Sequence, residues 1–463
     1  MQKMKNGKKV LSVCLSLAMA AGMLSTSAFA SWNVYGGSNN HNAVVTEAPT
    51  ATDASGLDSY IQLHCTGSGW DGVDNVPVMQ TVNGTTYAYV LYDGYGASGA
   101  LVAKIRCAEN GGSSIVWTTD PYGTEGTSLN AKSGFQLSTP YLDDNGTPND
   151  ASDDTLYVGT ISQYDDYEGG EWLTGTGSKV MALTGLDQNK PTVTNVLTGI
   201  NGQINTPITT DGTYLYFGTW PGGSRAGTYY QVKLSDYSVK TFTPDSYGFY
   251  WAGAVSDGTN VYFGSDNGLL YWRSIADFDT TGGVLDLTDV ASDAGNVRST
   301  VMLDDGYLYF TTQGGYLWCC SYDDGLTVEW HKKLGATSTS TPTKVGDRIY
   351  VGYYSGFNAG GVQCVTVSIG EDGSSYIPSV APVASGFPVQ SSIVVMGDGT
   401  GTDYLYFNTN AQKGVGYCYS YDGTTGSQVW GTTGDTYALG GMAIDNGYAV
   451  FGNDYNHLYV VHD

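Results

Sequence analysis

Two adjacent cysteines, Cys319 and Cys320, are the residues with the most evident chemical capacity in this sequence, because thiols bind metals, attack electrophiles and form disulfides. They lie within residues 317–322, Leu-Trp-Cys-Cys-Ser-Tyr, a run typical of a β-strand. Neighbouring side chains of a strand point to opposite faces, whereas a disulfide between adjacent cysteines needs a distorted turn. We therefore predict that both cysteines pack in the protein interior.

The other cysteines and the histidines show no metal-ligand spacing. Beyond residue 30 the cysteines stand at 65, 107, 319, 320, 364 and 418, and the histidines at 41, 64, 331, 457 and 462. The sequence contains no Cys-x-x-Cys, no paired-histidine motif and no Gly-x-Ser-x-Gly nucleophile elbow. Export would permit disulfides, and Cys65 with Cys107 is the pair that the sequence leaves open. We predict structural roles for the histidines.

One acidic loop, residues 143–154, carries the oxygen ligands that Ca²⁺ prefers. Its candidate ligands are Asp143, Asn145 and Asp150. Thr147 and Pro148 break the spacing of an EF-hand loop. A solvated hairpin loop is the alternative that we favour, so Ca²⁺ is a weak candidate and no other cofactor is predicted.

Aromatic residues form the third group with chemical capacity, because exposed rings on loops bind partners or stack on sugars. They concentrate in the longer connections that follow the second strand of a repeated unit, and in the connection that precedes the fourth unit. The candidates for a ligand-binding face are Tyr92, Tyr95, Tyr167, Trp172, Trp220, Tyr250, Trp251, Tyr353, Tyr354 and Phe357.

The elements that position these residues come from an internal repeat. A short strand, often begun by Thr-Pro, leads through a Gly/Asp turn to a strand of the type Tyr-x-Tyr-Phe-Gly, a loop and a third strand. Clear copies of the second strand are 214–218, 261–264 and 349–352, and further copies begin at residues 87, 156, 307, 404 and 448. The eight copies lie roughly 40 to 70 residues apart, a spacing that suits four strands per unit.

This repeat predicts an all-β protein, an eight-bladed β-propeller of four-stranded antiparallel blades, with seven blades as the alternative. Asp-Gly and Asn-Gly supply the positive φ angles of tight hairpins, and radial stacking covers sheet faces that one unit cannot bury. The last unit supplies only three strands, and residues 60–64 alternate as its missing partner. We expect this N-terminal strand to close the ring.

The third strands also align. With the Tyr-Asp pairs at 322 and 421 as anchors, Cys319, Cys364 and Cys418 fall at one equivalent position, matched by Val180 and Val102 in earlier units. A recurring interior position would show this pattern.

The first thirty residues have the features of a secretion signal. Four lysines precede an apolar run over 10–23, and Ala28-Phe29-Ala30 gives a small-x-small cleavage pattern. Cys14 lies inside the apolar run, which argues against lipidation. We therefore predict a signal peptide at 1–30 and a single propeller domain at 31–463. No later apolar run is long enough to span a membrane.

The charge of the chain argues against nucleic acid and anionic lipid as partners. It carries 19 basic and 44 acidic residues, a formal net charge of −25, and four of the basic residues lie in the predicted signal. Such a surface repels polyanions.

Residues 421–430, Tyr-Asp-Gly-Thr-Thr-Gly-Ser-Gln-Val-Trp, resemble the docking repeat of quinoprotein-like propellers, Ala-x-Asp-x-x-Thr-Gly-x-x-x-Trp. Residues 31–37 are similar to the Trp-containing opening segment of that superfamily, and 323–330 and 112–117 resemble shortened repeats. The resemblance to the quinoprotein alcohol dehydrogenase-like (PQQ-like repeat) propellers covers 31–463 and implies their fold. The superfamily includes dehydrogenases with pyrroloquinoline quinone and Ca²⁺ in a central funnel beside a vicinal disulfide, and cofactor-free scaffolds.

These observations favour a secreted, non-catalytic and monomeric propeller, extracellular or associated with the cell surface. Its aromatic loops would bind an extracellular protein, peptide or glycan. Two alternatives stay open: a dehydrogenase dependent on pyrroloquinoline quinone and Ca²⁺, and a glycan-active enzyme with carboxylates in the funnel. The loop that follows the cysteine pair in the dehydrogenases has no counterpart in this sequence.

Overall fold

The computed structural model describes residues 31–63, 72–94, 99–109, 111–120, 126–129, 136–161, 164–168, 171–174, 177–323, 325–371 and 375–463. These residues form β-strands, turns and two short 3-10 helices, η1 (Tyr35–Gly37) and η3 (Leu287–Asp289). In this part of the chain no helix is long and apolar enough to cross a membrane. The predicted signal peptide, Cys65 and Tyr95 lie outside the described residues.

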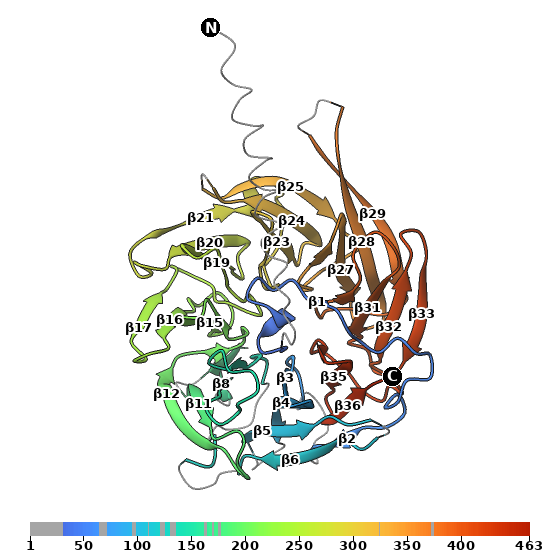
Figure 1. Cartoon of the computed structure of the whole chain (residues 1–463). Helices are drawn as coiled ribbons and strands as arrows, with labels where there is room; N and C mark the ends of the chain where they lie inside the picture. Colours follow the sequence, from blue (N-terminus) through green and yellow to red (C-terminus); the bar gives the residue numbers. More distant parts are fainter. Residues whose placement is uncertain are drawn as a thin grey trace. The chain divides into compact units, whose positions relative to one another are not determined.

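Eight antiparallel sheets, the blades, follow one another around a central axis (Figure 1). Within each blade, the four strands are labelled a to d in order from the axis to the rim. Blade 1 consists of β3 (Val78–Val82), β4 (Thr85–Gly94), β5 (Gly99–Arg106) and β6 (Ser114–Thr118), and blade 2 of β7 (Tyr141–Asp143), β8 (Thr155–Thr160), β11 (Ser178–Thr184) and β12 (Thr192–Ile200). Blade 3 consists of β14 (Thr209–Thr210), β15 (Tyr214–Trp220), β16 (Tyr229–Lys233) and β17 (Val239–Phe242), and blade 4 of β18 (Val255–Ser256), β19 (Asn260–Gly264), β20 (Leu269–Ser274) and β21 (Gly282–Asp286).

Blades 5 to 8 complete the ring and confirm the prediction of eight blades over the alternative of seven. Blade 5 consists of β22 (Met302–Asp304), β23 (Tyr307–Thr312), β24 (Tyr316–Ser321) and β25 (Thr327–Lys333), and blade 6 of β26 (Thr343–Val345), β27 (Arg348–Ser355), β28 (Ala359–Ile369) and β29 (Tyr376–Ser385). Blade 7 consists of β30 (Val394–Met396), β31 (Asp403–Asn408), β32 (Gly416–Tyr421) and β33 (Gly426–Gly431), and blade 8 of β34 (Ala443–Asp445), β35 (Tyr448–Gly452), β36 (His457–Val461) and β2 (Ile61–Gln62). Outside this scheme, β13 (Gln203–Ile204) pairs with the end of β15, and β9 (Tyr164–Glu168) pairs with β10 (Glu171–Thr174).

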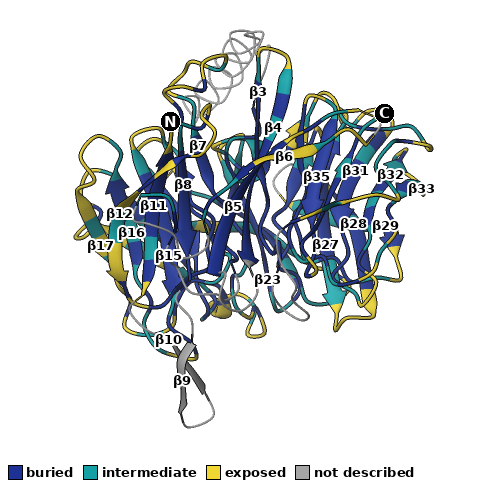
Figure 2. Ribbon diagram, turned by 90° about the horizontal axis from the view of Figure 1, so that it is seen from below, coloured by how far each residue is buried: buried dark blue, intermediate teal, exposed yellow. Residues whose placement is uncertain are grey.

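The second strands bury both of their faces, which is why their sequences lack a polar side. Along β15, Leu215 and Phe217 pack toward blade 2, while Tyr216 packs with Val261 and Phe263 of blade 4. Successive side chains of a strand point to opposite faces, so each blade fills the interfaces on both of its sides. Figure 2 shows the result: the inner strands are buried over most of their length, and the exposed residues gather at the turns and along outer strands such as β17.

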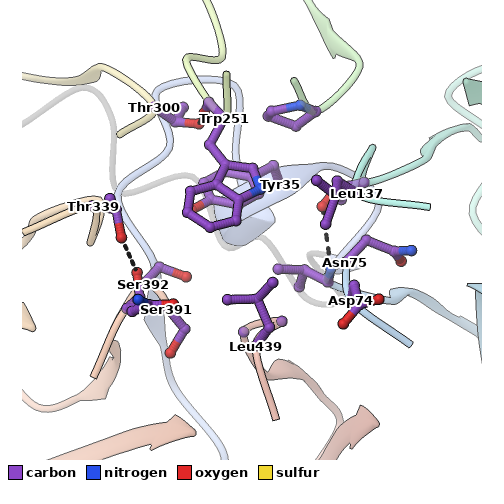
Figure 3. Close-up of a pocket in the computed structure, with 16 residues that line it drawn as sticks. Tyr35, Asp74, Asn75, Leu137, Trp251, Thr300, Thr339, Ser391, Ser392 and Leu439 are labelled. Carbon is purple, nitrogen blue, oxygen red and sulfur yellow. Dashed lines mark hydrogen bonds between the residues drawn. The ribbon is translucent and has the colours of Figure 1, made fainter. Parts of the chain in front are cut away.

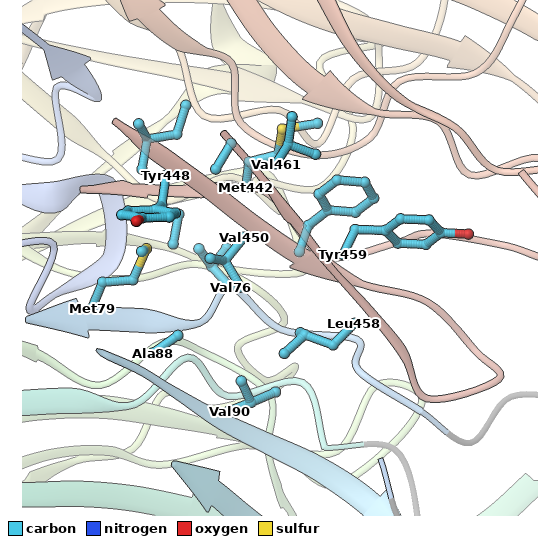
Figure 4. Close-up of a cluster of buried hydrophobic side chains, with 14 of the residues drawn as sticks. Val76, Met79, Ala88, Val90, Met442, Tyr448, Val450, Leu458, Tyr459 and Val461 are labelled. Atoms are coloured by element: carbon cyan, nitrogen blue, oxygen red, sulfur yellow. The ribbon is translucent and has the colours of Figure 1, made fainter. Parts of the chain in front are cut away.

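The interface between blades 8 and 1 is built in the same way (Figure 4). Met79 and Val90 of blade 1 face Val450 and Leu458 of blade 8, and all four are fully buried. The junction where the ring closes is therefore packed as a core.

Tight a–b turns use the residues that the sequence analysis singled out. Asn83-Gly84 and Asp305-Gly306 adopt positive φ angles of 49° and 77°, and of 48° and 82°. Two consecutive positive φ angles define the type I′ turn that matches the twist of a hairpin.

Ring closure by the N-terminal strand is confirmed. Ile61 of β2 pairs with Leu458 of β36 in an antiparallel ladder. Ser55 exchanges backbone hydrogen bonds with His462, and the Asp463 carboxylate accepts hydrogen bonds from the amides of residues 50 and 51. Segments from the two ends of the fold thus hold each other.

Residues 31–45, which we call the central segment, run between the first strands of several blades, an arrangement that the sequence did not predict. The amides of Met79, Leu142, Leu303 and Val395 donate to its carbonyls over distances of 2.7 to 2.9 Å. Its last residues form β1 (Val44–Val45), which pairs in parallel with β30. The chain therefore fills the centre of its own ring.

The cysteine pair lies in β24, as predicted. Cys319 packs in the cluster shared with blade 6, and Cys320 packs in the cluster shared with blade 4. Both are buried free thiols, and burial raises the pKa of Cys319 to about 12. The thiols point to opposite faces and form no vicinal disulfide.

The alignment of the third strands was right for three cysteines and wrong for the two valines. Cys319, Cys364 and Cys418 stand opposite Tyr309, Tyr350 and Tyr406, respectively, at one position of the repeat. At that position blades 1 and 2 have Lys104 and Ala182, opposite Tyr89 and Tyr157. Val102 and Val180 lie two residues earlier, because the first two blades lack the Tyr-Asp pair that anchors the alignment.

Candidate binding face

The two ends of the blades differ in their connections. Neighbouring strands are antiparallel, so the a–b and c–d turns lie at one end and the b–c loops and d–a connections at the other. We call the second end the loop face. Most of the aromatic residues predicted to bind a ligand belong to it, and the d–a connection between blades 3 and 4 carries three aromatic residues in a row.

This connection, residues 243–254, holds its aromatic residues in unusual backbone conformations. Tyr247 and Trp251 have φ angles of +64° and +58°, a region that costs a bulky residue roughly 1 to 3 kcal/mol. Between them, Phe249 is fully buried against Tyr229 and Phe263. The buried ring of Phe249 anchors the connection, and one strained aromatic residue lies on each side of it in the chain.

An ion pair between the partly exposed Arg298 and the buried Asp266 supports the neighbouring rings. Arg298 donates from Nε to Asp266 Oδ1 (2.7 Å) and from Nη2 to Oδ2 (2.5 Å), and Trp220 Nε1 donates to Oδ2 (3.0 Å). The Asp266 side chain is 3% exposed. Burial opposes the charge of Arg298, but hydrogen bonding and attraction to Asp266 outweigh it and raise the pKa of Arg298. Arg298 is therefore charged, and its two nitrogens hold Asp266 in a two-pronged geometry.

Three predicted residues meet on this support. The Arg298 guanidinium lies 4.5 Å from the centre of the Tyr250 ring. Trp220 and Tyr250 contact edge to face at 5.3 Å, and Tyr250 and Trp251 do so at 4.9 Å. The end of β15 and the connection between blades 3 and 4 thus form one aromatic cluster.

A pocket opens beside this cluster, between blade 3, blade 4 and the connection that leads from blade 4 to blade 5, and we call it the outer pocket. Its volume is about 640 Å³, within the range of roughly 300 to 1,000 Å³ that is usual for small-molecule sites. It is lined by Trp220, Gly223, Tyr247, Asp266, Asn267, Thr288, Ser292, Gly295, Asn296 and Arg298.

The second cavity lies on the axis and is much smaller, about 50 Å³. Figure 3 shows Tyr35 of the central segment within it and Trp251 lying across it, with Leu439 pointing inward. The d–a connections of all eight blades contribute to its wall. Tyr35 donates or accepts a hydrogen bond with Thr341 at 2.9 Å. The central segment therefore closes the cavity.

The residues of the central cavity do not fit the quinone cofactor and Ca²⁺ of the dehydrogenases. Among the described residues that line it, Asp74 is the one carboxylate, and no lysine or arginine is present to balance a polyanionic quinone. A volume of about 50 Å³ is several times below that of a small-molecule site. Cys319 and Cys320 lie in the packing between blades and not at this cavity.

Blade 6 brings further predicted residues to the loop face. β27 extends to Ser355, so Tyr353 and Tyr354 end a strand and do not begin a loop. Burial raises the pKa of Tyr354, with hydrogen bonding to Gln313 and the nearby charge of Arg298 opposing the shift. Phe357 is 41% exposed and contacts Tyr437, which precedes blade 8. Tyr354 thus lies toward Arg298, whereas Phe357 extends in the opposite direction around the ring, toward blade 8.

Tyr92 lies elsewhere than expected. β4 continues to Gly94, and Tyr92 pairs with Leu101 within the sheet and is fully buried in the core shared with blade 8. Its ring fills an interface between blades and is not presented to a ligand. Tyr167 and Trp172 pair across the β9–β10 hairpin, and Tyr95 is outside the described residues.

The acidic loop uses its carboxylates to build the hairpin. Asp143 accepts a hydrogen bond from the Asn145 amide, and Asp150 accepts two from Ser152. The Asn145 side chain donates to the carbonyl of Asp153. Nowhere in the described part of the chain do three His, Cys, Asp or Glu side chains converge as a metal site would require.

Sequence reasoning missed Tyr247, Asp266 and Arg298. Tyr247 stands two residues before the aromatic run that was singled out, and one glycine separates it from that run. Arg298 is one of few basic residues in an acidic chain, in a connection of the loop face. No spacing rule links positions 266 and 298, since the b–c loop of blade 4 and the connection that follows this blade bring them together.

Comparisons with known proteins show likeness of fold and not of sequence. No protein-family model matches this chain, and no curated protein matches it. Among solved structures, BamB from Moraxella catarrhalis is 12% identical with a TM-score of 0.51, covering 87% of this chain and 100% of that one. Sqt1 of Saccharomyces cerevisiae is 11% identical with a TM-score of 0.51, covering 88% of this chain and 100% of that one.

A dehydrogenase is among the similar structures as well. The quinohemoprotein alcohol dehydrogenase from Comamonas testosteroni is 10% identical with a TM-score of 0.54, covering 91% of this chain and 76% of that one. At such identities the likeness extends to the propeller fold alone.

Proposed function

We propose that this chain is a secreted, non-catalytic and monomeric binding module that engages an extracellular partner, protein, peptide or glycan, through the loop face. The predicted signal at 1–30 and the acidic composition support export and a partner that is not a nucleic acid. The observation that carries the proposal is the aromatic cluster of Trp220, Tyr250 and Trp251 on the Arg298–Asp266 pair, beside an open pocket.

Rigidity of this support favours recognition. An arginine fork fixes both oxygens of Asp266, and Phe249 anchors the adjoining connection in the core. Rings held in place lose little conformational entropy when a partner binds, so more of the contact energy remains as affinity.

The linings argue against hydrolysis of glycans at either cavity. Cleavage of a glycosidic bond generally uses two carboxyl groups on opposite sides of the bond. Among the described lining residues, the outer pocket offers Asp266, which is committed to Arg298, and the central cavity offers Asp74. Neither cavity supplies a pair.

Parallel capture experiments test the proposal. Immobilised wild type, Trp220→Ala and Tyr354→Ala are exposed to a mixture of secreted proteins and to an array of glycans. We expect a partner that wild type retains to be lost by both variants. Val284→Ala is the matched control, because Val284 is 54% exposed on the outer strand of blade 4.

Two results would contradict the proposal. In the first, Trp220→Ala and Tyr354→Ala retain the partner as wild type does. In the second, Val284→Ala loses it equally, which would place binding on the rim of the ring.

A further inference from the structure

We infer that the outer pocket is a carbohydrate site, in which Tyr247 forms the platform for one ring of a neutral sugar. This inference rests on the proposed function and names its ligand class. It comes from one residue whose conformation and exposure the protein's own packing does not explain, and from the chemistry of the wall around it.

Tyr247 is held in place by its main chain. Its amide donates to the Ser224 carbonyl (2.9 Å), and its carbonyl accepts from the Gly227 amide (2.8 Å). Both partners belong to the b–c loop of blade 3. These bonds keep a tyrosine at φ +64°, where an aromatic side chain is strained.

Among the described residues, no hydrogen bond or ring contact of the Tyr247 side chain accounts for this strain. The residue is 37% exposed and lines the outer pocket. Within the described residues its ring contacts no other ring and its hydroxyl makes no hydrogen bond. An aromatic face open to a pocket is the surface on which the C–H groups of a sugar ring stack.

Tyr237 provides an internal comparison. It too has a positive φ, +56°, and is 38% exposed. It lies in the c–d turn of blade 3, at the opposite end of the blade, and its ring packs edge to face on Tyr157 at 6.4 Å. The two tyrosines match in strain and exposure, but only the ring of Tyr237 has a partner inside the described protein.

The wall of the pocket suits hydroxyl groups that carry no charge. Asn267, Asn296, Thr288 and Ser292 supply amides and hydroxyls. Asn267 Oδ1 accepts from Ser265, Asn296 Nδ2 donates to Gln313, and the Thr288 hydroxyl donates to Asp286. Each of these groups has further donor or acceptor positions, as sugar hydroxyls require. The positive charge of Arg298 is balanced by Asp266. Nη1 of Arg298 lies outside that fork and is a further donor.

The charge of the protein excludes the acidic sugars. With a formal net charge of −25 and one neutralised cation in the pocket, the site repels uronic acids and sulfated glycans. The size of the pocket, about 640 Å³, suits a ligand of one to a few rings.

Affinity electrophoresis tests the inference with named probes. Wild type, Tyr247→Gly and Tyr237→Gly migrate through gels that contain hydroxyethylcellulose, glucomannan, galactomannan, laminarin or soluble starch, with polygalacturonate as the anionic comparator. Glycine adopts positive φ without strain, so both variants should fold. Circular dichroism and the unfolding midpoint verify this.

We expect at least one neutral polysaccharide to retard wild type. Tyr247→Gly should lower the association constant at least tenfold, and Tyr237→Gly less than twofold. The inference is wrong if no neutral polysaccharide retards wild type, if polygalacturonate retards it more strongly, or if the two variants lose binding equally.

The capture experiment above separates this inference from the proposed function. A protein partner that depends on Trp220 and Tyr354, together with no retardation by any polysaccharide, would overturn the carbohydrate site and leave the binding face standing. Retardation that is insensitive to Trp220→Ala, Tyr354→Ala and Tyr247→Gly would overturn both.

Discussion

The centre of the ring and the outer pocket are built in opposite ways. At the centre, the carbonyls of the central segment accept backbone hydrogen bonds from the first strands, and Tyr35 lines a cavity of about 50 Å³. The outer pocket is more than ten times larger, and the partly exposed Tyr247 lines it.

This difference indicates where a ligand can gain the most binding free energy from new contacts. Groups that already have partners offer little to a ligand, because binding would exchange one contact for another. A strained and exposed ring beside fixed polar groups has contacts still to make. We therefore propose that recognition takes place at the outer pocket, beside blades 3 and 4, and not at the axis.

Removing the anchor of the central segment should cause the largest loss of stability. Trp32 is 2% exposed and packs in the core of blades 8 and 1. Trp32→Ala should lower the free energy of unfolding by about 3 to 5 kcal/mol through lost burial and the cavity left behind. Urea denaturation measures this, and a loss below about 1 kcal/mol would show that the central segment is dispensable.

The support of the pocket should rank next. Arg298→Ala strands the buried Asp266 carboxylate and should cost about 3 kcal/mol, measured in the same urea series. Lys344→Ala is the matched control, because Lys344 pairs with Asp304 at a position where both side chains are about a quarter exposed, and solvent screening makes its loss smaller. Equal losses for the two variants would contradict a special role for the Arg298 pair.

Asp445, at the end of the first strand of blade 8, is a buried carboxylate whose pKa makes stability depend on pH. Asp445 accepts a hydrogen bond from Thr81 (2.8 Å), and burial raises its pKa from 3.8 to about 6. The folded state thus holds this proton more tightly than the unfolded state, so stability decreases as pH rises from about 4 through about 6.

Asp445→Asn should remove that pH dependence. The variant should match wild type near pH 4 and exceed it at pH 7, by of order 2 to 3 kcal/mol at most. Urea unfolding at both pH values checks the difference. A variant that is less stable than wild type at pH 7 would show that the ionised carboxylate contributes favourably.

The smallest effect on stability should come from Tyr247. Tyr247→Gly relieves the backbone strain but adds flexibility to the unfolded chain, and these terms offset each other. Its unfolding free energy should stay within about 1 kcal/mol of wild type, as thermal and urea unfolding would show. A larger loss would mean that the ring stabilises the fold and is not reserved for a ligand.

The eight blades could be predicted from sequence because each second strand repeats the same short pattern and each hairpin carries its own turn residues. Ring closure followed from a strand that the last unit lacked. The central segment could not be predicted, since residues 31–45 belong to no repeat and make parallel and irregular hydrogen bonds with several blades.

The candidate site was predictable in part. Trp220, Tyr250 and Trp251 were expected on one face and do meet there. Tyr92 was assigned to a loop because nothing in its local sequence shows that β4 extends to Gly94. The Arg298–Asp266 pair joins the b–c loop of blade 4 to the connection that follows this blade, and no local pattern encodes a contact across that distance in the chain.

The most direct test of the account compares the two cavities with one ligand. Isothermal titration measures the affinity of an oligosaccharide, taken from the polysaccharide that retards wild type most, for wild type, Tyr247→Gly and Leu439→Ala. Leu439 points into the central cavity (Figure 3). We predict that Tyr247→Gly weakens binding at least tenfold and that Leu439→Ala leaves it unchanged. Weakened binding for Leu439→Ala, with Tyr247→Gly equal to wild type, would place recognition at the axis and contradict the account.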